Sequence, residues 1–288
     1  LGFTFFSASM WVGQQLADGL DFWGFLGSLI LGGIILGIYT GLLGYVGAKT
    51  GLSLDLLSQR AFGEKGSYLP SAMTSFTQIG WFGVGSFVSG GTATPNFARF
   101  AKDGKAGAIT TVVAFFIGNS LMFFFGAVSS IFVGGNDIFE VMVRLNLFYL
   151  AVLVLGLNIW TTNDNALYTA GLGLANIFHQ RKKPMVLLSG IIGTVASVWL
   201  YYNFCGWLNI LNCTLPPVGM ILVLAYFMNK KDFETDQPKL KTVDWFAVAG
   251  VILGAIVANL LHWGIASING MVVAAVCYCV GQAVNKRK

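Results

Sequence analysis

Leu157 to Ala166 reads Leu-Asn-Ile-Trp-Thr-Thr-Asn-Asp-Asn-Ala and follows the apolar run Tyr149 to Gly156 with no turn signal between them. The stretch therefore continues a segment that is typical of a membrane helix, yet six of its residues are polar. Polar side chains at such depth usually face a bundle interior or a cavity on the path of a polar solute. They could instead only hydrogen-bond neighbouring helices. Six polar positions within eight residues favour a functional site.

These polar residues have helical spacing. At about 100° per residue, one helix face carries Asn158, Thr161, Thr162 and Asn165. Two adjacent hydroxyls, one turn after a backbone carbonyl, supply three hard oxygen atoms. Hard cations prefer oxygen ligands, so this face predicts a site for a small cation.

The composition is that of a helical membrane protein. Of the 288 residues, 56% are hydrophobic and only 10% are charged, and the mean hydropathy is +0.72. Soluble domains do not have this composition, and the apolar runs are too long for the strands of an outer-membrane barrel. Helices are the remaining way to satisfy backbone polar groups in lipid, so membrane lipid is a predicted partner.

The net charge of +5 does not indicate a nucleic-acid partner, because of where the cations lie. Every Lys and Arg except Arg144 falls in loops that we place on one side of the membrane. This asymmetry predicts that those loops and the C-terminus are cytoplasmic.

About eight apolar spans follow one another along the chain. The predicted spans are 1–16, 22–46, 108–133, 147–174, 184–204, 207–228, 244–261 and 265–283. The interval 67–98 does not fit this topology. Both its flanks are basic, yet about 32 residues are too few for two crossings. The interval is therefore either re-entrant or lacks residues.

Three smaller features refine this topology. Gly33, Gly37 and Gly41 repeat at four-residue spacing, which predicts close packing against another helix. The loop 48–66 carries a short amphipathic pattern of its own, at Leu52, Leu54, Leu56 and Leu57. The pair Pro216-Pro217 predicts a kink or break in its span.

Two spans contain matching interruptions. Ser89 to Pro95 is a poor helix, because it combines two adjacent glycines, three hydroxyls and a proline. The first span contains a similar short pattern. Phe5 to Ser9 and Phe87 to Gly91 share Phe-x-Ser followed by two small residues. Paired interruptions in two halves of a membrane protein indicate a transporter site at the repeat interface.

Five motifs spread over nearly the whole chain resemble the nucleobase-cation-symport family and, within it, the bacterial cytosine permeases. They are Thr-Phe-Phe-Ser-Ala-Ser-Met-Trp from Thr4, Leu-Gly-Tyr-Val-Gly-Ala-Lys-Thr-Gly-Leu from Leu43, Gln-Ile-Gly-Trp-Phe-Gly-Val-Gly from Gln78, Gly-Asn-Ser-Leu-Met-Phe from Gly118, and Leu-Gly-Leu-Asn-Ile-Trp-Thr-Thr-Asn-Asp-Asn-Ala-Leu-Tyr from Leu155. The last of these motifs is specific.

The resemblance implies an all-α membrane protein with the five-plus-five inverted repeat of LeuT-like transporters and two extra C-terminal helices. A single transporter domain would comprise an incomplete first repeat at about 1–85, a second repeat at about 86–228 and the extra helices at about 243–284. The implied function is the import of cytosine by sodium symport, through alternating access, across the bacterial inner membrane.

The resemblance also implies which residues bind the two solutes. Trp81 and Phe87 would sandwich the flat cytosine ring, and hydrogen bonds to its edge would come from Gln78, Ser86, Ser89, the backbone at Gly90, and Asn163. Sodium would bind the backbone carbonyls of Phe6, Ser9 and Asn158 and the hydroxyls of Thr161 and Thr162. The last three residues agree with the oxygen face predicted from helical spacing. Asn165 lies on the same face by angle, and only the resemblance implies that it is not part of the binding pocket.

The chain departs from the family pattern at one point. In these permeases further helices separate the Trp81 element from the Ser86-Phe87 element, whereas here Gly85 joins Ser86 directly. On one continuous helix, residues 81 and 87 would point about 120° apart and could not close on one ring. We therefore expect an interior stretch to be missing between Gly85 and Ser86, and a genuine deletion would make transport doubtful.

Other functions remain as alternatives. The same class includes a permease for another nucleobase, a hydantoin or a related planar ring, coupled to sodium or to protons. Protons could use Asp164, the one acid placed within a span, although we favour a carboxylate bonded to nearby helix ends.

A channel would need a charged ring or an uninterrupted pore lining. An enzyme would need a nucleophile with a base or a metal cluster, and no histidine is predicted deep in the membrane. We predict no cofactor beyond the coupling ion and no obligate protein partner.

Overall fold

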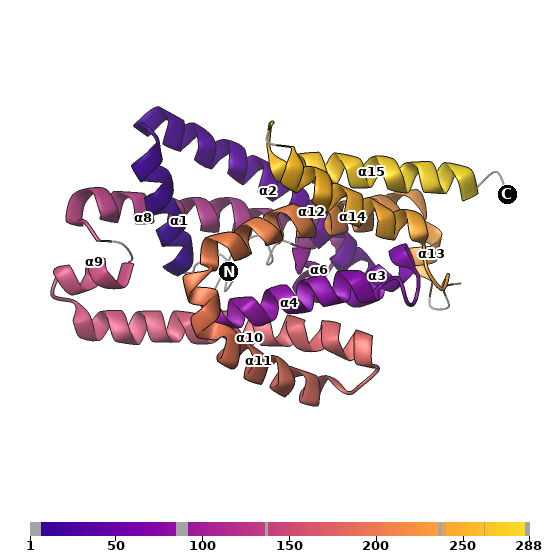
Figure 1. The fold of residues 1–288 in the computed structure, drawn as a ribbon, viewed down its shortest axis with the longest axis horizontal. Coiled ribbons are helices and arrows are strands. Elements are labelled where there is room, and N and C mark those ends of the chain that lie inside the picture. Colours follow the sequence, from indigo (N-terminus) through magenta and orange to yellow (C-terminus); the bar gives the residue numbers. More distant parts are fainter. Residues whose placement is uncertain are drawn as a thin grey trace.

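The computed structural model describes residues 7–84, 92–135, 138–235, 238, 240–261 and 263–285, and every regular element among them is a helix (Figure 1). The elements are α1 (Ser7–Gly19), α2 (Phe22–Thr50), α3 (Leu54–Phe62), α4 (Tyr68–Val84), α6 (Pro95–Ala98), α7 (Gly104–Val112), the π-helical segment η1 (Val113–Gly118), α8 (Asn119–Val133), α9 (Ile138–Arg144), α10 (Phe148–Phe178), α11 (Lys182–Tyr202), α12 (Phe204–Met228), α13 (Lys230–Glu234), α14 (Trp245–Leu260) and α15 (Ala266–Asn285).

Several of the long helical segments have the length and hydropathy of membrane spans. Within the described ranges, five segments are long and apolar enough to cross a membrane: Phe22–Thr50, Gly104–Val133, Lys182–Leu200, Gly206–Met228 and Ala266–Asn285. Large apolar side chains such as Phe132 (81% exposed) and Val195 (80% exposed) point outward, as a lipid environment favours. Helices form at all the predicted spans, and the amphipathic pattern in loop 48–66 belongs to a helix, α3.

Local sequence determines where several helices begin. Asp21 accepts a hydrogen bond from the Gly24 amide at the start of α2. Asp103 and Asp244 accept in the same way from the Ala106 and Ala247 amides at the start of α7 and α14. Such caps satisfy amides that have no partner in the first helical turn.

The glycine stripe of α2 is a helix contact, as predicted. A methyl group at Gly41 would lie 2.6 Å from the Val112 side chain, and one at Gly33 would lie 2.9 Å from the Phe116 ring. The same face continues to Gly44, which approaches Gly107 of α7. Small residues therefore let α2 approach α7 and η1 to backbone distance.

We expect Gly44→Ala to lower the free energy of unfolding by about 1–3 kcal/mol, because overpacking forces neighbours to move. Its methyl group would lie 2.5 Å from Thr111 Oγ1 and 2.9 Å from the Gly107 carbonyl oxygen. Gly27→Ala is the matched control on the same helix, since nothing lies within 4 Å of its added methyl group. It should raise stability by up to about 1 kcal/mol. Thermal unfolding in detergent checks this, and equal effects of the two substitutions would contradict the assigned contact.

Of the kink or break predicted at Pro216-Pro217, the break does not occur, because α12 runs through both prolines. The ring of Pro217 lies in a groove between α14 and α15, where methyl groups at Gly254 and Gly270 would each come within 3.2 Å of it. Packing of the proline ring between two glycines stabilises a helix that local sequence alone would interrupt.

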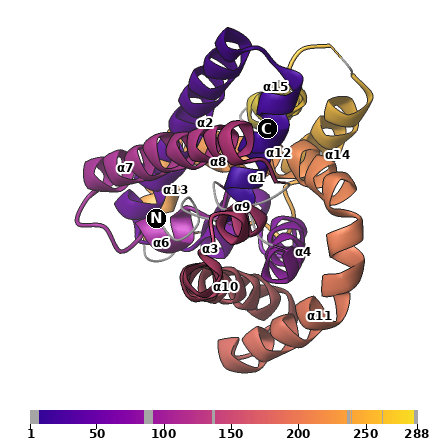
Figure 2. The same cartoon turned by 90° about the vertical axis from the view of Figure 1, so that its left-hand side faces the viewer.

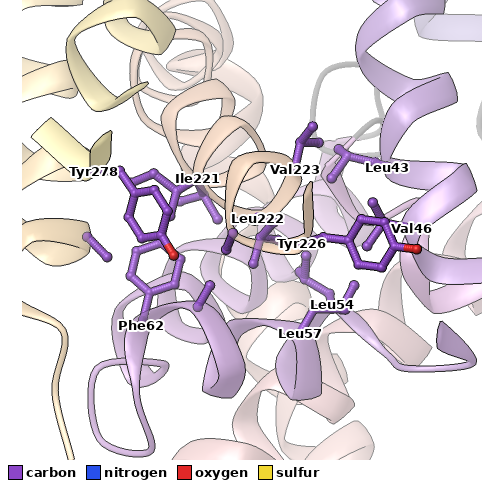
Figure 3. Close-up of a cluster of buried hydrophobic side chains, with 14 of the residues drawn as sticks. Leu43, Val46, Leu54, Leu57, Phe62, Ile221, Leu222, Val223, Tyr226 and Tyr278 are labelled. Carbon is purple, nitrogen blue, oxygen red and sulfur yellow. The ribbon is translucent and has the colours of Figure 1, made fainter. Parts of the chain in front are cut away.

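A hydrophobic core joins α2, α3, α12 and α15 (Figure 3). Leu222 and Tyr226 of α12 lie between Leu43 of α2, Leu57 of α3 and Tyr278 of α15, and all five are at most 2% exposed. Between membrane helices, such contacts stabilise the fold through van der Waals packing, because lipid tails are as apolar as these side chains. This core therefore fixes α3 against the helices that follow it much later in the chain.

Main-chain hydrogen bonds also join the end of α3 to the connection before α14. The amides of Glu64 and Lys65 donate to the carbonyls of Lys241 and Thr242 at 2.8 and 2.9 Å, and the Asp244 amide donates to the Phe62 carbonyl at 2.6 Å. The connection before α14 thus lies against the end of α3. Consequently α14 and α15 are attached to the body of the protein through α3 as well as through α12.

Candidate functional site

The polar stretch of α10 gathers three oxygen atoms. The hydroxyls of Thr161 and Thr162 both donate to the Asn158 carbonyl, each at 3.0 Å. A hydroxyl that donates its proton keeps lone pairs that can bind a cation. Thr162 is buried at 2% exposure, whereas Thr161 is exposed. The predicted oxygen face therefore exists as a cluster, with Thr162 on its covered side.

The neighbouring polar residues of α10 differ in their surroundings. Asn165 donates from Nδ2 to the Thr161 carbonyl at 3.0 Å, so its amide bonds to its own helix. Asn163 is half-buried. Asp164 is exposed, and no hydrogen bond or ion pair joins it to another described residue. Among the described residues, the expected bond between its carboxylate and nearby helix ends is therefore not formed.

Helix α4 lies beside α10 along much of its length in both views (Figures 1 and 2). Ser75 Oγ donates to the Ala170 carbonyl at 3.1 Å, and Asn176 Nδ2 donates to Ser67 Oγ at 3.0 Å. The residue numbers of these pairs change in opposite directions, so the helices are antiparallel. Continuing this register places the backbone of Trp81 level with Asn163 and Asp164. The structure thus brings two predicted substrate-binding positions to one level.

Gln78 of α4 is the clearest buried polar group near this level. Its side chain is 0% exposed, and neither Oε1 nor Nε2 has a hydrogen-bond partner among the residues that the structure describes. An unpaired buried amide costs about 1–3 kcal/mol, so its retention calls for a reason other than stability. A planar ligand that offers both a donor and an acceptor would satisfy it.

Several predicted site residues lie outside the described part of the chain. They are Phe6, Ser86, Phe87, Ser89 and Gly90, and for Ser9 and Trp81 only the backbone is described, in α1 and α4. Their roles remain predictions.

Sequence reasoning missed Trp207 of α12, which packs against α4. A methyl group at Gly80 would lie 2.1 Å from the Trp207 ring, and Phe76 meets the same ring edge-on with centroids 4.4 Å apart. Trp207 is 4% exposed, and its Nε1 is buried without a partner. Phe76 and Gly80 lie four residues apart on α4, a pattern that indicates an aromatic ring packed against this face. The pattern does not indicate which residue supplies that ring.

The amides of Gln14 in α1 and Asn119 in α8 were also missed. Gln14 is 2% exposed with both polar atoms unpaired, and Asn119 is 3% exposed with Oδ1 unpaired. The signal was available, since each is an amide within an otherwise apolar span. Both belong to a closely packed helix pair, where a methyl group at Gly13 would lie 2.1 Å from the Phe123 carbonyl oxygen.

A cavity of about 690 Å³ lies between α1, α2, α8, α12 and α15. Its lining is largely apolar and includes Asn119 and Tyr39, but none of the predicted site residues whose side chains the structure describes. The Tyr39 hydroxyl lies 2.8 Å from Thr92 Oγ1. Thr92 is the first described residue after the Gly85-Ser86 junction.

The apolar helices, with buried polar groups on α4 and α10, define a class, namely multi-pass helical membrane proteins. The solved structure of MHP1, a nucleobase-cation-symport-1 family transporter in a closed conformation with bromovinylhydantoin bound, matches the fold with a TM-score of 0.79. The match covers 98% of this chain and 90% of that chain at 15% sequence identity. The predicted LeuT-like fold class is confirmed.

The chain belongs to the family of permeases for cytosine/purines, uracil, thiamine and allantoin, whose model matches residues 2–93 and 84–284. The cytosine permease of Escherichia coli (strain K12) is 37% identical over 381 residues, which cover 100% of this chain and 90% of that protein. The allantoin permease of Bacillus subtilis (strain 168) is 34% identical over 82 residues, or 28% of this chain and 16% of that protein.

The same comparisons confirm the missing interior stretch. The two family matches meet at residues 84–93, and the 381-residue alignment with the Escherichia coli relative is far longer than the 288-residue chain. That relative therefore carries interior helices that this chain lacks. Gly85 and Ser86 themselves lie outside the described residues.

Proposed function

We propose that this protein imports cytosine together with sodium by alternating access. The proposal is supported by the relative named cytosine permease, which aligns over the whole of this chain. The observation that carries it is Gln78, a fully buried amide with no partner, on the helix that lies beside the polar stretch of α10. Cytosine is flat and neutral near pH 7, and its edge offers the donor and the acceptor that such an amide needs.

The proposed substrate site combines stacking with a polar edge. Trp81 and Phe87 would stack on the two faces of the ring, since aromatic side chains favour offset contacts with planar rings. The edge would meet Gln78, Asn163, Ser86, Ser89 and the backbone at Gly90. Two of these, Gln78 and Asn163, lie on the adjacent helices α4 and α10.

The proposed sodium site uses the oxygen cluster of α10. The Asn158 carbonyl and the hydroxyls of Thr161 and Thr162 already converge, and the carbonyls of Phe6 and Ser9 would complete the ligands from the first helix. Sodium bound there would stabilise the conformation that accepts cytosine. Such coupling is reciprocal, so cytosine would also strengthen sodium binding.

We further propose that the protein lies in a bacterial inner membrane with its C-terminus in the cytoplasm. The loops that contain α3, α6 and α13 carry Arg60, Arg99 and Lys230, whereas Arg144 ends α9 in the opposite loop. Basic loops are retained on the cytoplasmic side.

Uptake of labelled cytosine into proteoliposomes tests the function. We expect uptake driven by a sodium gradient to exceed uptake in choline by roughly tenfold, which is within the usual range of coupling between two sites. Unlabelled uracil and hypoxanthine should compete more weakly than unlabelled cytosine. Equal uptake in sodium and choline would contradict sodium coupling, and stronger competition by another ring would indicate a different substrate.

The missing interior helices supply a second arm of this test. Trp81 and Phe87 would lie about 120° apart on one continuous helix, so closure on the ring requires a longer connection between them. A version that carries the interior stretch of the Escherichia coli relative after Gly85 should therefore take up cytosine faster than the chain as it stands.

A further inference from the structure

A buried carboxyl group lies where α3, α4 and α10 meet, outside the proposed cytosine and sodium sites. Asp55, in the first turn of α3, is 5% exposed. Its Oδ1 accepts a hydrogen bond from Ser71 Oγ at 2.6 Å, whereas its Oδ2 is buried and has no hydrogen-bond partner. A charged carboxylate with one unpaired buried oxygen is costly, so its protonation state matters for the packing around it.

The groups around Asp55 form one neutral network across the three helices. Ser71 of α4 accepts from Asn176 Nδ2 of α10 at 2.9 Å. Asn176 Oδ1 in turn accepts from Gln59 Nε2 of α3 at 2.6 Å. A methyl group at Gly173 would lie 2.8 Å from the Ser71 carbonyl oxygen, so α10 approaches α4 closely at this point. Asp55 is the one acid in this network, which makes it the group through which pH can act.

A positive charge faces Asp55 without pairing to it. The Leu54 amide donates to Asn96 Oδ1 at 2.8 Å, which holds α6 against the start of α3. Arg99 lies one turn further on, and its Nε is buried without a partner. Its Nη2 donates to the Tyr168 hydroxyl of α10, so the guanidinium is held near α10 instead. Among the described residues, Asp55 Oδ2 and Arg99 Nε are therefore two complementary buried atoms that both lack a hydrogen-bond partner.

The other titratable groups around α3 have different partners. Tyr68 and His179 lie 3.5 Å apart at the ends of α4 and α10. Lys241 pairs with Asp244 before α14 at 3.0 Å. Two further groups bond toward α13: Arg60 donates to the Asp232 carbonyl, and Tyr226 donates to Glu234.

We propose that Asp55 is a proton-binding site that controls the junction of α3, α4 and α10. In the closed junction the carboxyl is protonated and bonded to Ser71. When the proton leaves to the adjacent solvent, the carboxylate exchanges Ser71 for the Arg99 guanidinium, and the ends of α4 and α10 separate. The ligand is a proton, taken from and returned to the cytoplasm in the orientation proposed above.

The direction of the pH effect follows from the pKa. Burial raises the pKa of Asp55 from 3.8 to about 6, although the Ser71 hydrogen bond and the Arg99 charge act in the opposite direction. In an opened, hydrated junction the pKa would return toward 3.8. The closed junction therefore binds the proton more tightly. Its extra stability is fully present below the lower pKa and is lost as the pH rises through about 6.

Infrared titration of the reconstituted protein tests the proton site without any substrate. We expect a protonated-carboxyl C=O band with a midpoint near pH 6, which disappears in Asp55→Asn. Glu64→Gln is the matched control, because Glu64 is an exposed acid at the other end of the same short loop, and the band should persist in it. A band that is unchanged in Asp55→Asn, or no band titrating above about pH 5, would overturn the assignment.

Hydrogen exchange tests the control of the junction. After correction for intrinsic rates, amides at the ends of α4 and α10 should be more protected at about pH 5 than at about pH 8. In Asp55→Asn, which keeps the shape and a neutral partner for Ser71, they should stay protected at both values. Arg99→Gln should reduce the opening at the higher pH. Protection that is independent of pH in the wild type, or equally pH-dependent in Asp55→Asn, would overturn the proposal. Neither measurement depends on cytosine or sodium, so failure of the proposed function would remain distinguishable.

Discussion

Replacement of Gln78 by leucine is expected to weaken cytosine binding about ten- to hundredfold while leaving the fold at least as stable. The side chain is fully buried, and both of its polar atoms lack partners in the ligand-free protein. Leucine has a similar size and removes an unsatisfied donor and acceptor, so unfolding should become harder by about 1–3 kcal/mol. Bound cytosine would lose the two hydrogen bonds that orient its edge.

The combination of weaker binding and greater stability distinguishes a substrate contact from a structural one. Thr77→Val is the matched control, because Thr77 is buried next to Gln78 and its hydroxyl donates to its own helix, to the Met73 carbonyl at 2.6 Å. Equilibrium binding of labelled cytosine and thermal unfolding should be measured on both variants. If Gln78→Leu binds cytosine as the wild type does, the amide is not part of the site.

Thr162→Ala is expected to weaken sodium dependence by about ten- to hundredfold, since hydrogen-bonding groups that contact charge contribute about 1.5–3 kcal/mol. Thr162 is 2% exposed, and its hydroxyl lies 3.0 Å from the Asn158 carbonyl, which is itself a proposed ligand. Thr162→Ser keeps the oxygen and should retain sodium dependence. The sodium concentration for half-maximal cytosine binding gives the readout.

Thr169→Ala provides the control for the helix itself. Thr169 lies two turns further along α10, is 1% exposed, and has a hydroxyl without a partner. Its loss should leave sodium dependence unchanged. Equal effects of Thr162→Ala and Thr169→Ala would mean that α10 packing, not an ion ligand, was disturbed.

Much of the fold could be predicted because helix period and hydropathy act locally. The glycines of α2 indicated a close contact, and the structure confirms it against α7 and η1. The amphipathic loop forms α3. Resemblance to one family predicted both the fold class and the missing interior helices, and the comparisons confirm both.

Features that depend on distant partners could not be predicted in this way. Pro216 and Pro217 stay within α12 because Pro217 packs against glycines of α14 and α15. Trp207 fills the space at Gly80 from a segment more than a hundred residues away. Sequence spacing shows which residues share a helix face, but not which other helix covers that face.

The candidate site was predictable in part. Helical spacing alone placed Asn158, Thr161 and Thr162 together. In the structure, the hydroxyl oxygens of Thr161 and Thr162 each lie 3.0 Å from the Asn158 carbonyl oxygen. The helical angle of about 100° per residue could not show that Thr162 is buried and Thr161 exposed, because burial depends on which neighbouring helices pack there. The exposed position of Asp164 escaped prediction for the same reason.

Binding of labelled cytosine to the purified protein, measured in sodium and in choline, tests the central claim most directly. That claim is that the polar groups of α4 and α10 bind a planar ring and its coupling ion as one linked unit. The account predicts that sodium raises the affinity for cytosine and that saturating cytosine raises the affinity for sodium by the same factor. Equal cytosine affinity in sodium and choline would contradict it.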